Sequence, residues 1–348
     1  MMAPNPLLNV GVVGATGMVG KEFLKILEER KFPVQELRLF AGAKSEGSNV
    51  NFRGRPHTVS TLANGCFKGL HIVFFSAGAP ISKEWAPKAV KEGALAVDNS
   101  SAYRMVNDVP LVVPEVNGHL LPVAGKPALI ANPNCSTIQL AIVLNPLKEK
   151  FGLREVRVAS YQSVSGAGKE AVEELKQQSI DVLTKNVSPT DLKATVLPHP
   201  IAFNNIPQIG DFDEHGYSEE ETKIINETRK ILDLHDLRVT AFAVRTPTLN
   251  AHSEAVWVTL KEAATRETIL KTLRPAPGVE VIDDPQSQKY PLNIVASGRD
   301  PVYVGRIRQD PVDPKTWLFW IAADNIRKGA ALNGIQIAEQ VFDLNRTP

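Results

Sequence analysis

The hexapeptide NPNCST places Cys135 where a strand gives way to a helix. The apolar run at 128–131 predicts a short buried strand, and residues 137–147 predict a helix. Pro133 disfavours an earlier helical start and Asn134 is a good N-cap, so we expect Cys135 in the first helical turn. Free backbone N–H groups and the helix dipole lower the pKa of a thiol there. Cys135 is therefore either a nucleophile or a buried structural cysteine.

A cysteine nucleophile needs a proton-transfer partner, and its substrate needs an anchor. Arg245 follows one predicted strand and His252 opens the next, so the two residues flank one connection. In one interpretation, Arg245 and His252 face a common cleft. In the other interpretation, Arg245 is a surface residue and His252 is a histidine held by hydrogen bonds. Gln162 ends a further strand just before the sequence SGAG, whose glycines would let a ligand approach the backbone.

Two further charged segments are candidates for ligand contacts. Arg104 lies after a strand, where open α/β sheets carry ligands, and it can either bind an anion through two hydrogen bonds or solvate a loop. The sequence EEETK at 219–223 opens a predicted helix after Gly216. Acidic residues at a helix N-terminus are common without any ligand, and that is the default interpretation here.

Residues 9–41 predict the beginning of a dinucleotide-binding fold. A strand at 9–13 leads through the glycine-rich sequence GATGMVG into a helix that ends near Arg30, and a second strand follows at 36–41. The glycines would let a pyrophosphate approach the backbone and rest on the helix N-terminus. The spacing is GxxGxxG instead of the commoner GxGxxG, and a tight turn without a ligand is the alternative.

The end of the second strand bears on the choice of cofactor. An acidic residue there would hold a ribose hydroxyl and favour NAD, but the strand continues into the sequence GAKSEG. Lys44 and Ser45 suit a 2′-phosphate and so predict NADP, whereas Glu46 counts against it. The alternative for Lys44 is a solvated loop lysine.

The remaining pattern predicts two domains with different sheets. The first half alternates strands and helices: a hairpin around Arg53 and Gly54, strands at 71–76 and 95–98, and a helix at 82–92. The second half has more strands, at 155–164, 238–244, 253–260, 303–308 and 317–323, with helices at 168–184 and 326–342. We expect the last helix to be amphipathic and to return to the first domain.

The composition excludes several classes of function. The chain has 348 residues, long enough for two domains, and 39 basic against 38 acidic residues, which favours neither nucleic acid nor a membrane surface. No apolar run approaches the length of a membrane span, and residues 1–8 lack the features of a signal peptide. The two cysteines, Cys66 and Cys135, predict a reducing compartment, hence the cytoplasm, and Cys66 is expected to be structural. We expect no metal site.

Five strings in order carry a more specific signal: GATGMVG, ANPNCST, SYQSVSGAGKEA, HPIAFNNIPQI and ADNIRKGAALNGIQIAE. Together, from about residue 9 to 342, they resemble aspartate-semialdehyde dehydrogenases. The resemblance implies an α/β protein with a Rossmann-like dinucleotide-binding domain at 1–134, completed by a C-terminal helix at 326–348. It also implies an α+β catalytic and dimerisation domain at 135–325, with a mostly antiparallel or mixed sheet, and a homodimer.

The resemblance also implies a role for each site residue. Cys135 resembles the nucleophile that forms an acyl thioester, Gln162 the residue that orients the acyl group, and His252 the acid/base. The substrate-binding positions are Arg245 for a carboxylate, Arg104 with Lys223 for a phosphate, and Glu220, with Glu221 as its rival, for an ammonium. The cofactor positions are Gly14, Thr16, Gly17, Met18, Val19, Lys44, Ser45, Gly166, Ala167, Gly168 and Asn325. Two positions depart from the family pattern: Ala251 stands where glycine is usual, and Lys44 where arginine is usual.

The implied reaction is the NADPH-dependent reduction of L-4-aspartyl phosphate to L-aspartate 4-semialdehyde, with release of phosphate, on the route to lysine, methionine and threonine. Two rivals remain at this level. A related enzyme would reduce N-acetylglutamyl phosphate, which lacks the free ammonium that an acidic residue would bind. A non-enzymatic NADP-binding regulator would share the first domain but would not need Cys135, Gln162, Arg245 and His252 together.

Overall fold

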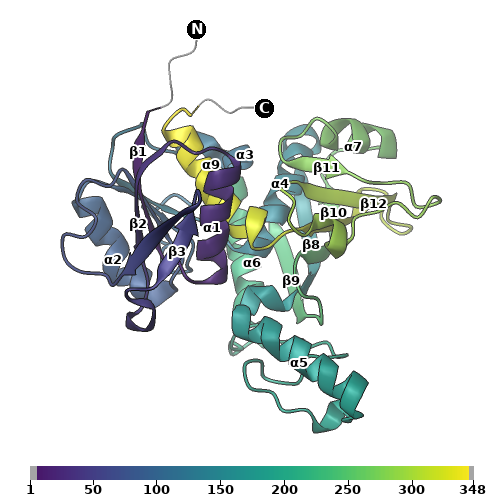
Figure 1. Cartoon of the computed structure of the whole chain (residues 1–348). Helices are drawn as coiled ribbons and strands as arrows, with labels where there is room; N and C mark the ends of the chain where they lie inside the picture. The colour runs from purple at the N-terminus through teal and green to yellow at the C-terminus, as the bar shows by residue number, and fades with distance from the viewer. Residues whose placement is uncertain (1–5, 345–348) are drawn as a thin grey trace. The chain divides into compact units, whose positions relative to one another are not determined.

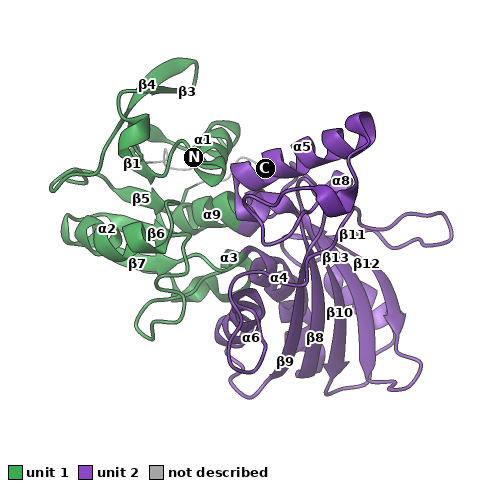
Figure 2. Cartoon of the chain, turned by 90° about the horizontal axis from the view of Figure 1, so that it is seen from below, with its two compact units in different colours: residues 1–134, 330–348 green, residues 135–329 purple. Residues whose placement is uncertain are grey.

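Each half of the chain is built on a sheet of its own (Figures 1 and 2). The computed structural model describes residues 6–344. An N-terminal unit comprises residues 1–134 and 330–348, and a central unit comprises residues 135–329. The chain therefore returns to the N-terminal unit at 330, later than the boundary at 326 that we expected from the sequence.

The N-terminal unit holds a seven-stranded sheet with the order β3-β4-β2-β1-β5-β6-β7, in which only β3 and β4 pair antiparallel. The strands are β1 (Leu8–Val13), β2 (Val34–Phe40), β3 (Asn49–Phe52), β4 (Arg55–Ser60), β5 (Ile72–Phe75), β6 (Leu95–Asp98) and β7 (Ala128–Ala131). The helices are α1 (Met18–Glu29), α2 (Ala79–Lys91), α3 (Pro114–Asn117) and α9 (Leu332–Val341). The predicted Rossmann-like fold is confirmed.

Side-chain alternation along the strands builds a core on each face of this sheet. Phe74 packs in the core with α1 and α9, whereas its neighbour Phe75 packs in the core with α2. Phe23 of α1 stacks on Phe74 with 4.7 Å between ring centroids. β1 pairs with β2 on one side and β5 on the other, so the chain order reverses at β1 and the glycine-rich turn follows this switch point.

Two local expectations for this unit have different outcomes. The hairpin at Arg53 and Gly54 is confirmed, and both residues have positive φ, 51° and 72°, as a two-residue hairpin turn requires. The helix predicted over 326–342 differs, because residues Arg327–Ala331 form a π-helical turn before α9 begins. α9 is also buried on nearly every side instead of amphipathic, and it packs against α1, α3 and β6.

The central unit holds a six-stranded sheet with the order β11-β12-β13-β10-β8-β9. Pairs β8–β9 and β11–β12 are parallel and the others antiparallel, so the predicted mixed sheet is confirmed. The strands are β8 (Leu153–Gln162), β9 (Arg238–Arg245), β10 (His252–Leu260), β11 (Val279–Val281), β12 (Val302–Gln309) and β13 (Thr316–Ala323). The helices are α4 (Cys135–Phe151), α5 (Lys169–Lys185), α6 (Glu219–Leu232), α7 (Arg266–Leu273) and α8 (Asn293–Ala296).

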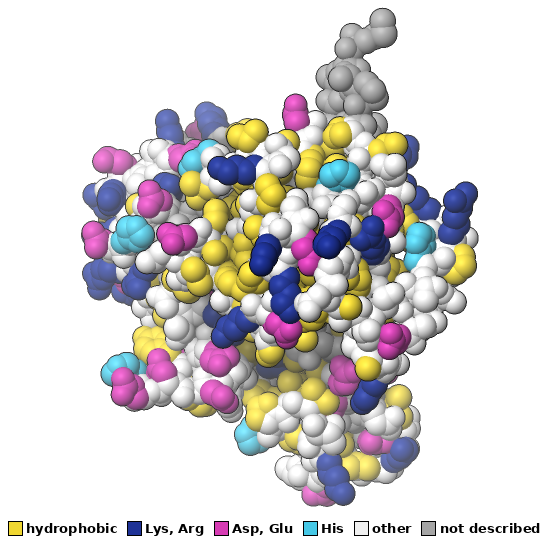
Figure 3. Space-filling view, turned by 90° about the vertical axis from the view of Figure 1, so that its left-hand side faces the viewer, with side chains coloured by type: hydrophobic (Ala, Val, Ile, Leu, Met, Phe, Trp, Pro, Cys, Tyr) yellow, Lys and Arg dark blue, Asp and Glu magenta, His cyan; other side chains and the backbone are white. Residues whose placement is uncertain are grey.

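Helices α4 and α6 cover one face of this sheet beside β8, β9 and β10 (Figure 2). α4 extends beyond the predicted 137–147 at both ends and includes Pro146, because most of its side chains are buried and packing offsets the missing backbone donor. The opposite face leaves Tyr161 and Phe242 exposed. Charges of both signs are interspersed over the face shown in Figure 3. Within residues 6–344, no helix combines the length and apolarity needed to cross a membrane.

Candidate active site

Cys135 is the first residue of α4, a helix of 17 residues, which is the position that the sequence predicted. Among the described residues, Cys135 takes part in no disulfide, and it is partly exposed. The π-helical turn at 327–331 passes alongside it: a Cβ atom built on Gly329 would lie only 2.8 Å from the Cβ of Cys135. A glycine at 329 is therefore what allows the chain to run this close to the thiol.

Arg245 is the last residue of β9. Its side chain is buried and interacts electrostatically with Cys135. Its Nη1 donates a hydrogen bond of 2.8 Å to the carbonyl oxygen of Ser163. Burial lowers the pKa of Arg245, while the charges of Glu220 and Cys135 raise it. The guanidinium remains protonated in any case, so its positive charge and the N-terminus of α4 both favour the thiolate form of Cys135.

His252 opens β10 and is fully buried. Its Nδ1 accepts a hydrogen bond of 3.1 Å from the backbone N–H of Ser163 and lies 3.0 Å from the Ser163 hydroxyl. The ring proton is therefore on Nε2, which has no hydrogen-bond partner among residues 6–344. Burial, and secondarily the charge of Arg245, lower the pKa of His252 to about 3, so the imidazole is neutral at physiological pH.

Gly166 shows that Arg245 and His252 converge. A Cβ atom built on Gly166 would lie 2.9 Å from Arg245 Nη1 and 3.1 Å from His252 Nε2. The 3₁₀ turn Val164–Ala167 can pass here only because residue 166 lacks a side chain. Arg245 and His252 therefore lie beside the same turn, as the sequence interpretation of a shared cleft requires.

A second set of polar side chains lies around Gln162, the last residue of β8, which pairs with Arg245 on β9. Gln162 Nε2 donates a hydrogen bond of 3.1 Å to Glu220 Oε1 and one of 3.2 Å to the hydroxyl of Ser160. Lys223 lies one helical turn after Glu220, with Nζ 3.8 Å from Glu220 Oε2 and 3.4 Å from Glu219 Oε2. Gln162, Glu220 and Lys223 therefore form one continuous polar group.

The structure separates Glu220 from its rival Glu221. Glu221 completes a capping box with Ser218, accepting 2.7 Å from the Ser218 backbone N–H at Oε2. Its Oε1 accepts 2.9 Å from the backbone N–H of Ala243, so both oxygens are engaged by the main chain. Glu220 instead lies beside Gln162 and interacts with the charge of Arg245. The carboxylate of Glu221 is thus engaged by the main chain, whereas that of Glu220 lies among the polar side chains around Gln162.

Ala251 adopts φ = 67°, a left-handed conformation that favours glycine, which explains why glycine is the usual residue at this position. Two amides hold this strained residue: its N–H donates 3.0 Å to Asn325 Oδ1, and its carbonyl accepts 2.7 Å from Asn293 Nδ2. Asn325 also accepts from the hydroxyls of Ser163 and Ser165. The side chain predicted to contact the cofactor is thus engaged in fixing the loops around His252.

Ser163 is the residue of the site that sequence reasoning missed. Its backbone N–H holds His252, its carbonyl oxygen holds Arg245, and its hydroxyl contacts Asn325. The only signal in the sequence was its position between Gln162 and the SGAG turn. Its partners lie 82, 89 and 162 residues away, so no local pattern reveals them.

The predicted cofactor residues of the N-terminal unit form a turn that fits a dinucleotide. Gly14 has φ = 85°, and a Cβ atom on Gly20 would lie 2.1 Å from the Gly14 carbonyl oxygen, so the turn packs tightly against α1. No side chain caps α1 at Gly17 and no acidic residue occupies its first turn, which leaves this helix N-terminus suited to a phosphate. Met18 and Val19 are the first residues of α1.

The loop after β2 meets this turn. Thr16 Oγ1 lies 3.3 Å from the Ser45 hydroxyl, and Lys44 is exposed on the 3₁₀ turn Ala43–Ser45. The carboxylate of Glu46 accepts 3.1 Å from the hydroxyl of Thr61. Ser45 therefore contacts the glycine-rich turn, Lys44 is its exposed neighbour, and Glu46 is held by Thr61.

Arg104 belongs to the N-terminal unit and Lys223 to the central unit. The guanidinium of Arg104 is largely buried and donates 3.0 Å from Nε to the carbonyl oxygen of Asn132 and 3.0 Å from Nη2 to that of Asn99. These bonds fix Arg104 on the loops that follow β6 and β7, where a parallel sheet presents ligand-binding residues.

Comparison with known proteins identifies relatives of the whole chain. Residues 9–123 match a family model described as semialdehyde dehydrogenase, NAD binding domain, and residues 144–328 match one described as semialdehyde dehydrogenase, dimerisation domain. The aspartate-semialdehyde dehydrogenase of Aquifex aeolicus is 50% identical over 331 residues, 95% of this chain and 96% of that protein. That of Bacillus subtilis is 45% identical over 346 residues, 97% of this chain and 98% of the relative.

Solved structures agree with these sequence matches. Aspartate semialdehyde dehydrogenase II of Vibrio cholerae, in a structure described as complexed with ASA, gives a TM-score of 0.91 at 38% identity and covers 97% of this chain and 99% of that one. The Candida albicans enzyme, described as solved with NADP, gives a TM-score of 0.74 at 25% identity, covering 97% and 98% of the two chains. The resemblance indicated by the five sequence strings is confirmed.

Proposed function

The chain belongs to the aspartate-semialdehyde dehydrogenase family, and we propose that it reduces L-4-aspartyl phosphate reversibly to L-aspartate 4-semialdehyde with NADPH. The reaction would lie on the route to lysine, methionine and threonine. One observation carries the proposal: Arg245 Nη1 and His252 Nε2 converge on Gly166, and Arg245 also interacts with the charge of Cys135. A nucleophile, a cation and a hydrogen-bond donor are thus in one unit.

Cys135 acts as the nucleophile. Its thiolate attacks the acyl carbon, the bond from that carbon to the phosphate oxygen breaks, and inorganic phosphate leaves with the bonding electrons. The N-terminus of α4 and the guanidinium of Arg245 stabilise the thiolate before attack. An ordinary carboxylate would not react in this way, because it offers no comparable leaving group.

His252 stabilises negative charge on the reacting oxygen. NADPH, when bound, would supply a hydride to the acyl carbon of the Cys135 thioester, which would then become a hemithioacetal anion. The Nε2–H of the neutral imidazole can donate to the oxygen that becomes negative, and the hemithioacetal then collapses to the aldehyde as the thiolate leaves. No net proton transfer is needed for this collapse, so a hydrogen-bond donor suffices. This refines the acid/base role expected from the resemblance.

The polar group around Gln162 binds and orients the substrate. Arg245 binds the α-carboxylate, Glu220 the α-ammonium, and Gln162 orients the acyl group between them. Arg104 and Lys223 supply positive charge for the phosphate. N-acetylglutamyl phosphate has no ammonium to pair with Glu220, so this arrangement favours the aspartyl substrate.

The cofactor preference follows from the N-terminal unit. The turn from Gly14 to Val19 would hold the pyrophosphate on the N-terminus of α1, and Lys44 with Ser45 would hold a 2′-phosphate. β2 ends without an acidic residue that would repel that phosphate. Residues 166–168 and Asn325 of the central unit are the further cofactor positions that we propose.

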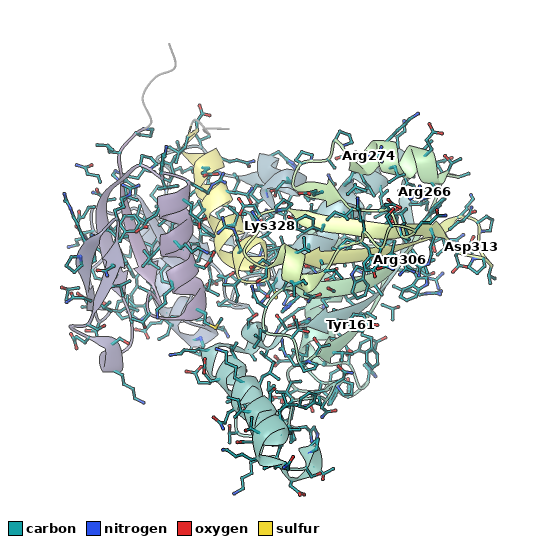
Figure 4. The ribbon with its side chains drawn as sticks, turned by 45° about the vertical axis from the view of Figure 1, so that its right-hand side comes forward. Tyr161, Arg266, Arg274, Arg306, Asp313 and Lys328 are labelled. Carbon is teal, nitrogen blue, oxygen red and sulfur yellow. The ribbon has the colours of Figure 1, made fainter. Side chains whose placement is uncertain are left out.

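The exposed face of the central sheet supports a homodimer. Tyr161, labelled in Figure 4, packs on Trp320 with 5.5 Å between ring centroids, and Phe242 is 55% exposed on the same face. An apolar sheet face that no other element among residues 6–344 covers suits a second copy of the same surface. Phe242→Asp should therefore shift the sedimentation coefficient towards the monomer.

The decisive assay measures NADP⁺ reduction by the purified protein with L-aspartate 4-semialdehyde and inorganic phosphate. We expect reduction that depends on both the semialdehyde and phosphate. N-acetylglutamate semialdehyde in place of the aspartate compound is the matched control and should react poorly. Preferential turnover of the acetylated compound would overturn the substrate assignment, and reduction without phosphate would overturn the acyl-phosphate chemistry.

A further inference from the structure

Glu254 is a fully buried carboxyl group for which the proposed mechanism has no use. It lies on β10 two residues after His252, so both side chains are on the face of the sheet that α4 covers. Neither carboxylate oxygen of Glu254 reaches a partner with hydrogen-bond geometry within residues 6–344. A buried group in this state requires an explanation, since an unpaired carboxylate loses its hydration without compensation.

The neighbours of Glu254 belong to the active site. Ser160, directly opposite on β8, accepts a hydrogen bond from Gln162. Gln139 of α4 lies near the carboxyl group and is one turn of helix after Cys135, on the same face of α4. Glu220 of α6 interacts with Glu254 through its charge. Glu254 therefore lies beneath the residues that bind substrate.

Charge on Glu254 would be unfavourable in these surroundings. Burial raises the pKa of Glu254 to about 8; the amide of Gln139 opposes this shift in part, and the charge of Glu220 raises the pKa by a smaller amount. The other ionisable groups of this site are Cys135, Glu220, Arg245, His252 and Lys223, which neighbour one another through hydrogen bonds or charge. Glu254 therefore holds its proton at neutral pH.

We propose that Glu254 is a positioning residue, kept as a neutral carboxylic acid beneath the site so that Glu220 alone presents negative charge to the substrate ammonium. The role rests on the proposed function, because it concerns the same substrate site. If Glu254 ionises, a second negative charge repels Glu220, disturbs the Glu220–Gln162 hydrogen bond and disfavours the Cys135 thiolate. Activity should fall as the pH rises through the titration of Glu254.

The test compares the pH dependence of kcat/KM for L-aspartate 4-semialdehyde in the parent enzyme and in Glu254→Gln. Above its pKa, a single inhibitory ionisation lowers kcat/KM by about tenfold per pH unit. The parent should show this decline from about pH 8, whereas in Glu254→Gln it should begin at least one unit higher. Glu254→Met, also unable to ionise, should behave likewise, which keeps the test available if one variant folds poorly.

Glu174→Gln is the matched control, since Glu174 is a buried glutamate of α5 with hydrogen-bond donors at the backbone of Thr195 and Val196. Its profile should coincide with that of the parent. Infrared spectra give a readout that does not depend on the substrate: a protonated-carboxyl band should be present at pH 7, titrate with a midpoint near pH 8 and be absent from Glu254→Gln. Absence of that band would overturn the claim that Glu254 is a neutral acid. If the band is present but the parent and Glu254→Gln have the same pH profile, the positioning role is overturned.

Discussion

The backbone N–H of Ser163 donates a hydrogen bond of 3.1 Å to Nδ1 of His252, which places the ring proton on Nε2. Nε2 is the nitrogen near Gly166 and Arg245, so the imidazole presents a neutral N–H donor on that side. Conversion to an imidazolium would break the Ser163 bond and add a cation beside Arg245. Both effects oppose protonation, in the same direction as burial.

His252 should therefore remain neutral and in the Nε2–H form throughout the working pH range. Its folded-state pKa of about 3 lies below the ordinary 6.5, so unfolding takes up a proton between these values and the free energy of unfolding falls as the pH drops through that window. Two-dimensional ¹⁵N NMR of the imidazole from pH 5 to 8 should show one unchanged tautomer. A titration with a midpoint near 6.5 would contradict the assignment.

Cys135→Ser should abolish turnover while NADP binding stays intact, because an alcohol is a far weaker nucleophile than a thiolate and residue 135 is not among the proposed cofactor positions. Steady-state kinetics and quenching of protein fluorescence by NADPH measure the two properties. Cys66→Ser is the matched control and should retain activity, since burial raises the pKa of the Cys66 thiol and keeps it protonated. Near-normal turnover of Cys135→Ser would end the thioester mechanism.

Arg245→Lys should mainly raise KM for the semialdehyde, by about 10- to 100-fold, because a lysine cannot form the paired hydrogen bonds of a guanidinium with a carboxylate. His252→Ala should instead lower kcat by about 10²- to 10⁴-fold, the range for loss of a catalytic hydrogen-bonding or proton-transfer group. The two variants are each other's control. If the histidine variant alone changed KM, the assignments would have to be exchanged.

Lys44→Ala should reduce apparent NADP affinity by about 10- to 100-fold and leave the KM for NAD nearly unchanged, because only NADP carries the 2′-phosphate. Glu46→Gln provides a comparison: Glu46 is bonded to Thr61, so its loss should alter neither cofactor strongly. The measurement is kcat/KM for both cofactors in all three proteins. Equal losses for NAD and NADP in Lys44→Ala would show that Lys44 does not contact the phosphate.

Gly329→Ala should lower kcat while the protein remains folded. The added Cβ would lie 2.8 Å from the Cβ of Cys135, so the thiol must shift, and a displacement near 1 Å can cost about 10²-fold in rate. Slower alkylation of Cys135 by iodoacetamide, with an unchanged circular-dichroism spectrum, would support this reading. If kcat and the rate of Cys135 alkylation are the same in Gly329→Ala as in the parent, the π-helical turn shifts to accommodate the added Cβ and the thiol stays in place.

The sequence by itself determined the features that depend on neighbouring residues. The helix that begins at Cys135, the hairpin at Arg53 and Gly54 and the acidic start of α6 at Glu219 follow from capping preferences, turn chemistry and the period of apolar residues. The five strings, taken in order, also identified the family. Each string is a short local motif, so it can be read without knowledge of the fold.

Only the tertiary structure decided how the chemical groups meet. The choice between Glu220 and Glu221 depended on which carboxylate reaches the Ala243 N–H on a neighbouring strand. The proton position on His252 depended on Ser163, 89 residues away, and the buried state of Glu254 on the packing of α4 over β10. Hydrogen bonds and desolvation act between groups close in space, so they cannot be read from residues that are distant along the chain.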